Sequence, residues 1–240
     1  MRWLATAALT LGLSATAACS PDIAGPVAPS PGTVTIPTTP ATPTSTTRPG
    51  QASPTTTGPG ATRPGIRMVV VPLPDGSFNI TEDVMLSRAT NILQLQLPAS
   101  GEQLPGMMTK TSPHATGLRM TTNGTTIPLA NSEVNKPTDV PLTSAVSSLR
   151  LTYRLTGSTV RRTPAKPERA ASAIRPLTAV SEGGLPTNLT ISGGDLLNAV
   201  CPLLPQPLCA VGDPPNLSVL QGIPADKALV VLQLDLPQPQ

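Results

Sequence analysis

The chain has 240 residues, of which 31 are proline, 19 are glycine and only three are aromatic. A formal net charge of +3 with so few aromatic rings argues against a nucleic-acid-binding protein, which needs clustered cations and side chains that stack on bases. Three cysteines and one histidine are too few to build the usual metal centres, so neither a metal nor another cofactor is expected.

The first nineteen residues are typical of an export signal. Arg2 supplies a positive start, an apolar run follows from Trp3 to Leu13, and small residues lead to Cys19. The run is much shorter than the roughly 20 residues that a membrane-spanning helix needs. We therefore expect residues 1–18 to be a cleaved signal peptide.

Ala17 and Ala18, directly before Cys19, resemble the lipobox of bacterial lipoproteins. The resemblance covers only this N-terminal stretch. It implies that Cys19 is acylated, becomes the new N-terminus and anchors an extracytoplasmic protein to the cell membrane. Thr16 departs from the pattern, in which Leu is commonest at that position. Ala15–Ala17 also fits the A-x-A cleavage site of a freely secreted protein.

Residues 19–65 are rich in proline and threonine and contain few charges. Such a segment buries too little apolar surface to offset the entropy of ordering it, so we expect a disordered stalk. Residues 66–240 contain enough Leu, Val and Ile to fold as one domain, whose core must be aliphatic. Its many prolines argue against long helices.

Short apolar runs separated by turn residues predict a mainly β, antiparallel, sandwich-like domain. Asn123-Gly124 predicts a tight hairpin, because this dipeptide readily adopts positive φ angles. Ser148–Thr156 alternates most cleanly, with its leucines and Tyr153 on one face and its arginines on the other. Strands are expected at 67–73, 93–97, 148–156, 188–191, 217–220 and 228–236, the last of them central in its sheet.

One or two short helices are expected as well. Pro167 and Glu168 are typical of a helix start, which predicts a turn or two up to Arg175. Asp195 has the character of an N-cap for a short helix ending at Val200. Glu82–Ile92 has no proline and fits either a helix or a strand, since periodicity does not distinguish them here.

Cys201 and Cys209 are the cysteines that remain after Cys19. Because an exported chain meets an oxidising compartment, these two residues are expected to form a disulfide. Their spacing does not match the Cys-x-x-Cys of redox-active sites, so the expected role is structural.

The sequence from Arg150 to Arg175 contains seven cations and one acidic residue, Glu168. Alternation places Arg150 and Arg154 on one face of their strand. We expect a patch that attracts anionic headgroups or an anionic envelope polymer; the alternative is the solvated face of a hairpin. The candidate anion-binding residues are Arg150, Arg154, Arg161, Arg162, Lys166 and Arg169.

No arrangement of residues predicts catalysis. His114 is the one histidine and is expected in a solvated loop, because no nucleophile motif accompanies it. Glu82 and Asp83 are adjacent, so on an extended chain their carboxylates point apart. Gly193-Gly194 lacks the lysine and the glycine spacing of a phosphate-binding loop.

The leading hypothesis is therefore a non-catalytic, lipid-anchored envelope protein whose β-domain binds a wall component or a partner protein. The first alternative is a carrier or chaperone for an apolar ligand, because the interior is aliphatic. A hydrolase comes third, since catalytic residues can lie far apart in a sequence.

Overall fold

The computed structural model describes residues 57–101, 104, 108–161 and 169–237. They belong to one compact unit, Thr47–Gln240. The predicted signal peptide, Cys19, most of the predicted stalk, Arg162 and Lys166 lie outside the described residues.

The domain is mainly β, as predicted. Its larger sheet has seven strands in the order β12-β8-β1-β2-β5-β3-β4, and a second sheet has four in the order β6-β7-β13-β9. All pairs are antiparallel except β1 with β8. The larger sheet comprises β1 (Gly65–Pro72), β2 (Phe78–Leu95), β3 (His114–Thr122), β4 (Thr125–Ile127), β5 (Thr138–Thr156), β8 (Pro186–Ile191) and β12 (Ile223–Pro224).

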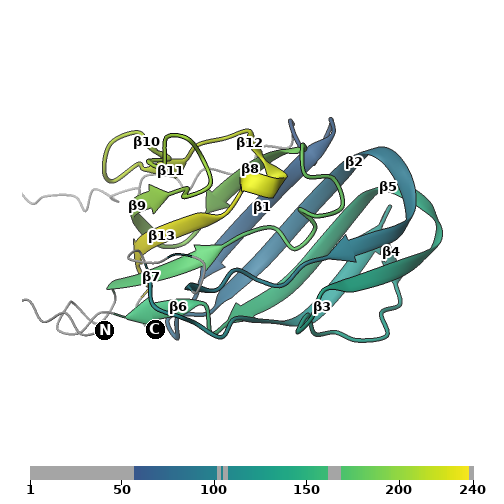
Figure 1. Ribbon diagram of the computed structural model, residues 1–240, viewed down its shortest axis with the longest axis horizontal. Helices are drawn as coiled ribbons and strands as arrows, with labels where there is room; N and C mark the ends of the chain where they lie inside the picture. Colours follow the sequence, from purple (N-terminus) through teal and green to yellow (C-terminus); the bar gives the residue numbers. More distant parts are fainter. Residues whose placement is uncertain (1–56, 102–103, 105–107, 162–168, 238–240) are drawn as a thin grey trace, which may run out of the picture. The chain divides into compact units, whose positions relative to one another are not determined.

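The four-stranded sheet lies over one face of the larger sheet, so that the two enclose a common core (Figure 1). It comprises β6 (Thr159–Arg161), β7 (Arg169–Ile174), β9 (Asp195–Val200) and β13 (Val230–Asp235). A ribbon of β10 (Ala210–Val211) and β11 (Ser218–Val219) adjoins β9, and the 3-10 turn η2 (Ala225–Lys227) precedes β13.

The alternation in the sequence accounts for the core. Leu149, Leu151, Tyr153 and Leu155 of β5 are all buried, as expected for one face of a strand packed against a second layer. Met68 and Val70 of β1 and Ile80 of β2 continue this apolar face across the sheet. Because aromatic residues are scarce, Leu, Val, Ile and Met fill almost all of the interior.

Other strand predictions are confirmed. Asn123 and Gly124 have φ angles of 48° and 79° and join β3 to β4. The last strand, β13, is central in its sheet, between β7 and β9. The ambiguous stretch Glu82–Ile92 is part of β2.

Both predicted helices are wrong. Arg169–Ile174 is strand β7, and Asp195–Val200 is strand β9. Each pairs with β13, so hydrogen bonding to a buried central strand outweighs the local helix signals. The described residues contain no α-helix and no helix that could cross a membrane.

Residues 57–65, which the composition placed in the stalk, pack on the larger sheet. Gly60 is buried against the backbone of Arg67 and Asp83, where a Cβ atom would come within 2.4 Å of the Arg67 nitrogen. The amides of Ala61 and Thr62 both donate to the carbonyl of Gly58. The missing side chain of Gly60 therefore lets this segment approach the backbone of β1 and β2 closely, which the composition alone did not reveal.

Candidate functional site

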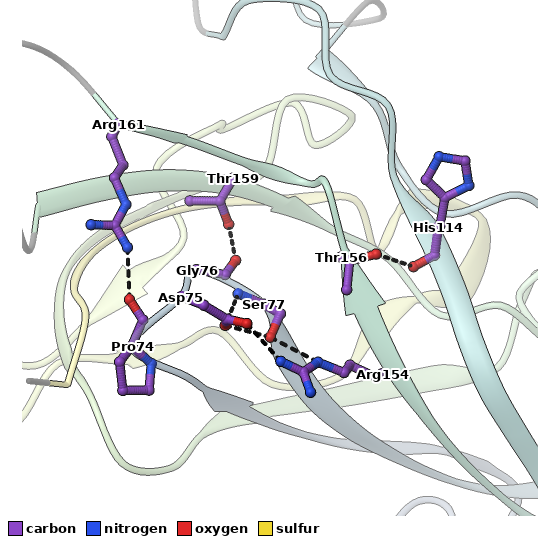
Figure 2. Close-up of polar contacts among 9 residues, drawn as sticks. All are labelled: Pro74, Asp75, Gly76, Ser77, His114, Arg154, Thr156, Thr159 and Arg161. Atoms are coloured by element: carbon purple, nitrogen blue, oxygen red, sulfur yellow. Dashed lines mark hydrogen bonds and ion pairs between the residues drawn. The ribbon is translucent and has the colours of Figure 1, made fainter. Parts of the chain in front are cut away.

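Two of the predicted anion-binding arginines converge on the turn between β1 and β2 (Figure 2). Arg154 comes from the end of β5 and Arg161 from the end of β6. Gly157 lies between these strands, with φ 68°, where the chain passes from one sheet to the other. The arrangement brings the two arginines to one place from different sheets.

The turn itself is organised by Asp75. Its Oδ1 accepts from the backbone nitrogen of Ser77 at 2.9 Å and from the Ser77 hydroxyl at 2.6 Å. Arg154 Nη2 donates to Oδ2 of Asp75 at 2.6 Å, and its Nε donates to the Ser77 hydroxyl at 3.1 Å. The hydrogen bonds from Ser77, together with the charge of Arg154, lower the pKa of the Asp75 carboxyl.

Arg161 contacts the same turn differently. Its Nη2 donates to the carbonyl oxygen of Pro74 at 2.7 Å, and the Thr159 hydroxyl donates to the carbonyl of Gly76 (Figure 2). A carbonyl oxygen carries no net charge, so this hydrogen bond differs from the ion pair that Arg154 makes with Asp75.

Arg150 lies farther along β5, in a second ionic cluster. Oδ1 of Asp83 accepts from Arg150 Nε at 2.5 Å, and Oδ2 accepts from Arg67 Nη2 at 2.6 Å and Nε at 3.1 Å. Only 9% of the Asp83 side chain is exposed. The hydrogen bond and charge of Asp83 raise the pKa of Arg150. This cluster joins β1, β2 and β5 on the outer face of the sheet.

Arg169 and Arg175 lie on and directly after β7. Arg169 Nε donates to Oδ1 of Asp235 at 3.3 Å, and Arg175 donates to the carbonyl oxygen of Leu97. The predicted patch therefore includes arginines that each face a carboxylate, namely Arg150, Arg154 and Arg169. Those carboxylates are Asp75, Asp83 and Asp235, which lie outside the stretch from Arg150 to Arg175 and so did not enter its charge count.

His114 is exposed, as expected, although it begins strand β3 rather than lying in a loop. Its carbonyl oxygen accepts from the Thr156 hydroxyl at 3.5 Å, and its imidazole points away from this contact (Figure 2). Among the described residues, no hydrogen bond or ion pair involves the imidazole. Nor do they include a group of three His, Cys, Asp or Glu residues suited to a metal ion.

Glu82 is the ionisable residue whose importance the sequence did not indicate. It is fully buried in the core, where Oε2 accepts from the Leu177 nitrogen at 3.0 Å and from the Tyr153 hydroxyl at 3.5 Å. Oε1 accepts from both the nitrogen and the hydroxyl of Thr178. Burial raises the pKa of Glu82, and these hydrogen bonds oppose that effect.

Glu82 thus fastens the segment after β7 to the larger sheet, and this segment forms one wall of a groove. Ser181 exchanges hydrogen bonds with the backbone of Gln94, and Oε2 of Glu182 accepts from the Ser87 nitrogen at 2.9 Å. The pairing of β2 with β5 is irregular between Met85 and Ile92, which exposes this part of β2.

The groove is open to solvent and has a volume of about 670 Å³. Both polar and apolar groups line it, and it contains one basic and two acidic side chains. Its lining residues are Leu86, Ser87, Arg88, Ala89, Thr90, Ile92, Gln94, Asp139, Ser181 and Glu182. Sequence reasoning missed it, because it depends on the irregular pairing of two long strands.

The predicted disulfide between Cys201 and Cys209 is confirmed, with a Cα to Cα distance of 5.8 Å. Both half-cystines are buried. The bond closes a loop beside β9, in keeping with a structural role.

No family model matches this chain, and no curated protein matches it significantly.

Proposed function

We propose that the chain is a non-catalytic, exported lipoprotein whose β-domain binds a component of the cell envelope or a partner protein in the groove beside β2. The observation that supports this best is the groove itself. It combines an opening to solvent with polar, charged and apolar groups in one lining.

Export and anchoring are supported by the sequence from Met1 to Cys19. The resemblance to a lipobox implies an acylated Cys19, which makes the membrane the first partner of the chain. The disulfide between Cys201 and Cys209 fits an oxidising, extracytoplasmic compartment.

A binding role is favoured over catalysis because the conspicuous carboxylates are engaged in structural contacts. Glu82 accepts four hydrogen bonds in the core, Asp83 joins two arginines, and Asp75 organises a turn. Within the part of the chain that the structure describes, the exposed imidazole of His114 has no hydrogen bond that would orient it as a base.

The groove favours a hydrophilic, extended partner. Arg88 can pair with an acidic group, Asp139 and Glu182 with basic or hydroxyl groups, and Ile92 offers apolar surface. A wall polymer with hydroxyl and amide groups, or an extended peptide, suits this lining. The apolar-carrier alternative draws no support from it, because a lipid chain needs an enclosed and largely apolar cavity.

The first test of the proposal is the mass of the mature N-terminal peptide, isolated from membranes of the native host. An acylated Cys19 is the expected result. An unmodified start at or before Cys19 would contradict the anchor and leave a secreted protein.

The second test concerns the groove. Wall fragments from the native host are titrated against the mature chain and against Arg88→Ala and Arg119→Ala. Both variants lose one exposed cation, but only Arg88 lines the groove, and we expect only Arg88→Ala to weaken binding. An equal effect of both would indicate attraction by net charge alone, and turnover that is lost on changing His114 would contradict a non-catalytic role.

A further inference from the structure

The residues after β9 form a segment with exposed aliphatic side chains. We call residues 202–220 the apolar tip; it includes the disulfide loop and the ribbon of β10 and β11 (Figure 1). Among the described residues, seven large hydrophobic side chains are exposed, and four of them lie in this short segment: Leu203, Leu208, Val211 and Leu220.

The base of the apolar tip is held firmly. Cys201 and Cys209 are buried and disulfide-bonded, and Val219 is buried in the same core. The Leu220 nitrogen donates to the Cys209 carbonyl at 2.8 Å, and the Cys201 nitrogen donates to the Pro207 carbonyl at 2.7 Å. The exposed leucines are therefore carried by a backbone that the disulfide and these hydrogen bonds constrain. The most exposed of them is Leu208, at 75%.

We infer that the apolar tip inserts into the interfacial region of a lipid bilayer. The segment contains a single charged residue, Asp213, so little charge must be desolvated. It also contains five prolines, which have no backbone N–H group to be left without a hydrogen-bond partner in an apolar medium. Binding strength at a membrane surface scales with the apolar area buried.

A protein partner fits the composition less well. Protein interfaces are enriched in Tyr, Trp and Arg, and the apolar tip contains none of them. Membrane insertion depends on the apolar area that is buried, and the exposed leucines and Val211 of the apolar tip supply such area.

The predicted stalk allows the apolar tip to reach the bilayer, and this part of the inference rests on the proposed lipid anchor. The 37 residues 20–56, between Cys19 and the described part of the chain, can span at most about 120 Å. That reach exceeds the length of β5, the longest strand of the domain, whose 19 residues span about 60 Å. The bilayer therefore stays within reach, and the anchor turns a weak contact into an intramolecular one.

The experiment uses the mature chain from residue 19 with Cys19→Ser, so that binding does not depend on acylation. Its partition into phosphatidylcholine vesicles is measured by co-sedimentation. We expect measurable binding that changes little with salt or with added anionic lipid. Leu203→Ser combined with Leu208→Ser should lower the partition coefficient at least tenfold, since each leucine would lose its transfer from water.

Leu97→Ser combined with Val180→Ser is the matched control, because both residues are exposed and lie outside the apolar tip and outside the groove. This pair should bind like the parent chain, and circular dichroism should show that both variants fold. Equal binding by the tip variant, or no binding by the parent, would overturn the inference. Binding that requires anionic lipid and is lost at high salt would also overturn the inference, because it would indicate that arginines, rather than the apolar tip, bind the membrane.

Self-association without vesicle binding, abolished by the tip variant, would instead assign the apolar tip to a second copy of the chain and overturn the membrane role. The fate of Cys19 is read separately, from the mass of the native N-terminal peptide. Failure of the anchor and failure of the apolar tip can therefore be told apart.

Discussion

Glu82 and Asp83 are consecutive residues of β2, yet their carboxylates lie on opposite faces of the seven-stranded sheet. Glu82 points into the core and holds Leu177 and Thr178, whereas Asp83 points outward and holds Arg67 and Arg150. One pair of neighbouring acids thus fastens the second layer to the sheet and ties three strands together on its outer face.

The hydrogen bond from the Thr178 hydroxyl to Glu82 provides the first prediction. Thr178→Val keeps the shape of the side chain but removes a donor to a buried carboxylate, and should lower the free energy of unfolding by about 1.5–3 kcal/mol. Thr187→Val is the control, because Thr187 is equally buried but makes only a 3.5 Å contact with the Leu185 carbonyl. Urea denaturation should show a clearly smaller loss for the control; similar losses would contradict a special role of Glu82.

The second prediction concerns pH. Because burial raises the pKa of Glu82, the folded protein binds a proton more tightly at this site than the unfolded chain does. The contribution of Glu82 to stability is therefore greatest below its unfolded pKa and is lost as the pH rises through the folded pKa. The difference in unfolding free energy between the parent chain and Glu82→Gln should fall as the pH rises above about 4.5.

Comparison with Glu82→Gln removes the contributions of other acids. Asp75 has a lowered pKa, so its contribution is present above its unfolded pKa and is lost as the pH falls, the opposite direction. A parent-minus-variant difference that is constant with pH, or that grows as the pH rises, would show that the hydrogen bonds to Glu82 outweigh its burial.

The strands were predictable from the sequence where one face is buried and the other solvated. Leu149 to Leu155 and the Asn123-Gly124 hairpin are examples, because alternation and turn chemistry are local properties. Two strands were predicted to be helices, Arg169–Ile174 and Asp195–Val200. Both pair with β13, and this pairing cannot be recognised from the residues of either strand alone.

The candidate site was harder to predict for the same reason. The partners of Arg150 and Arg154 are 67 and 79 residues away in the sequence, on strands whose adjacency comes from the topology. The disulfide was predictable because only two cysteines remained to pair. The groove was not, because its walls come from an irregular stretch of β2 and from a connection that follows β7.

A third prediction compares two carboxylates that each bind arginine. The side chain of Asp83 is 9% exposed and joins two guanidinium groups, whereas that of Asp75 is 57% exposed and joins one. Asp83→Asn should lower the unfolding free energy by about 2–4 kcal/mol, because it removes the negative charge that the largely buried Arg67 faces at this position. Asp75→Asn should cost less than about 1 kcal/mol, because exposed ion pairs contribute little and asparagine can still accept from Ser77.

Chemical denaturation of both variants at low and moderate salt checks this prediction. The loss in Asp83→Asn should persist at moderate salt, since a buried pair is screened less than an exposed one. Equal losses for the two variants would mean that burial does not decide the value of these ion pairs.

The last prediction concerns the disulfide at the base of the apolar tip. Replacing Cys201 and Cys209 together by alanine should lower the unfolding free energy by about 2.5 kcal/mol, because the open chain regains the entropy that the nine-residue loop had removed. The loop contains Pro202, Pro205 and Pro207, which already restrict the unfolded chain, so this figure is an upper value for the entropic part.

Denaturation with and without a reductant provides the control. Reduction should destabilise the parent chain by a similar amount and leave the double-alanine variant unchanged. After reduction, limited proteolysis should cut first between residues 202 and 208. The disulfide between Cys201 and Cys209 then no longer joins the two ends of that loop, whereas β9 stays paired with β13. Equal resistance of that loop before and after reduction would show that backbone hydrogen bonds, rather than the disulfide, hold the apolar tip in place.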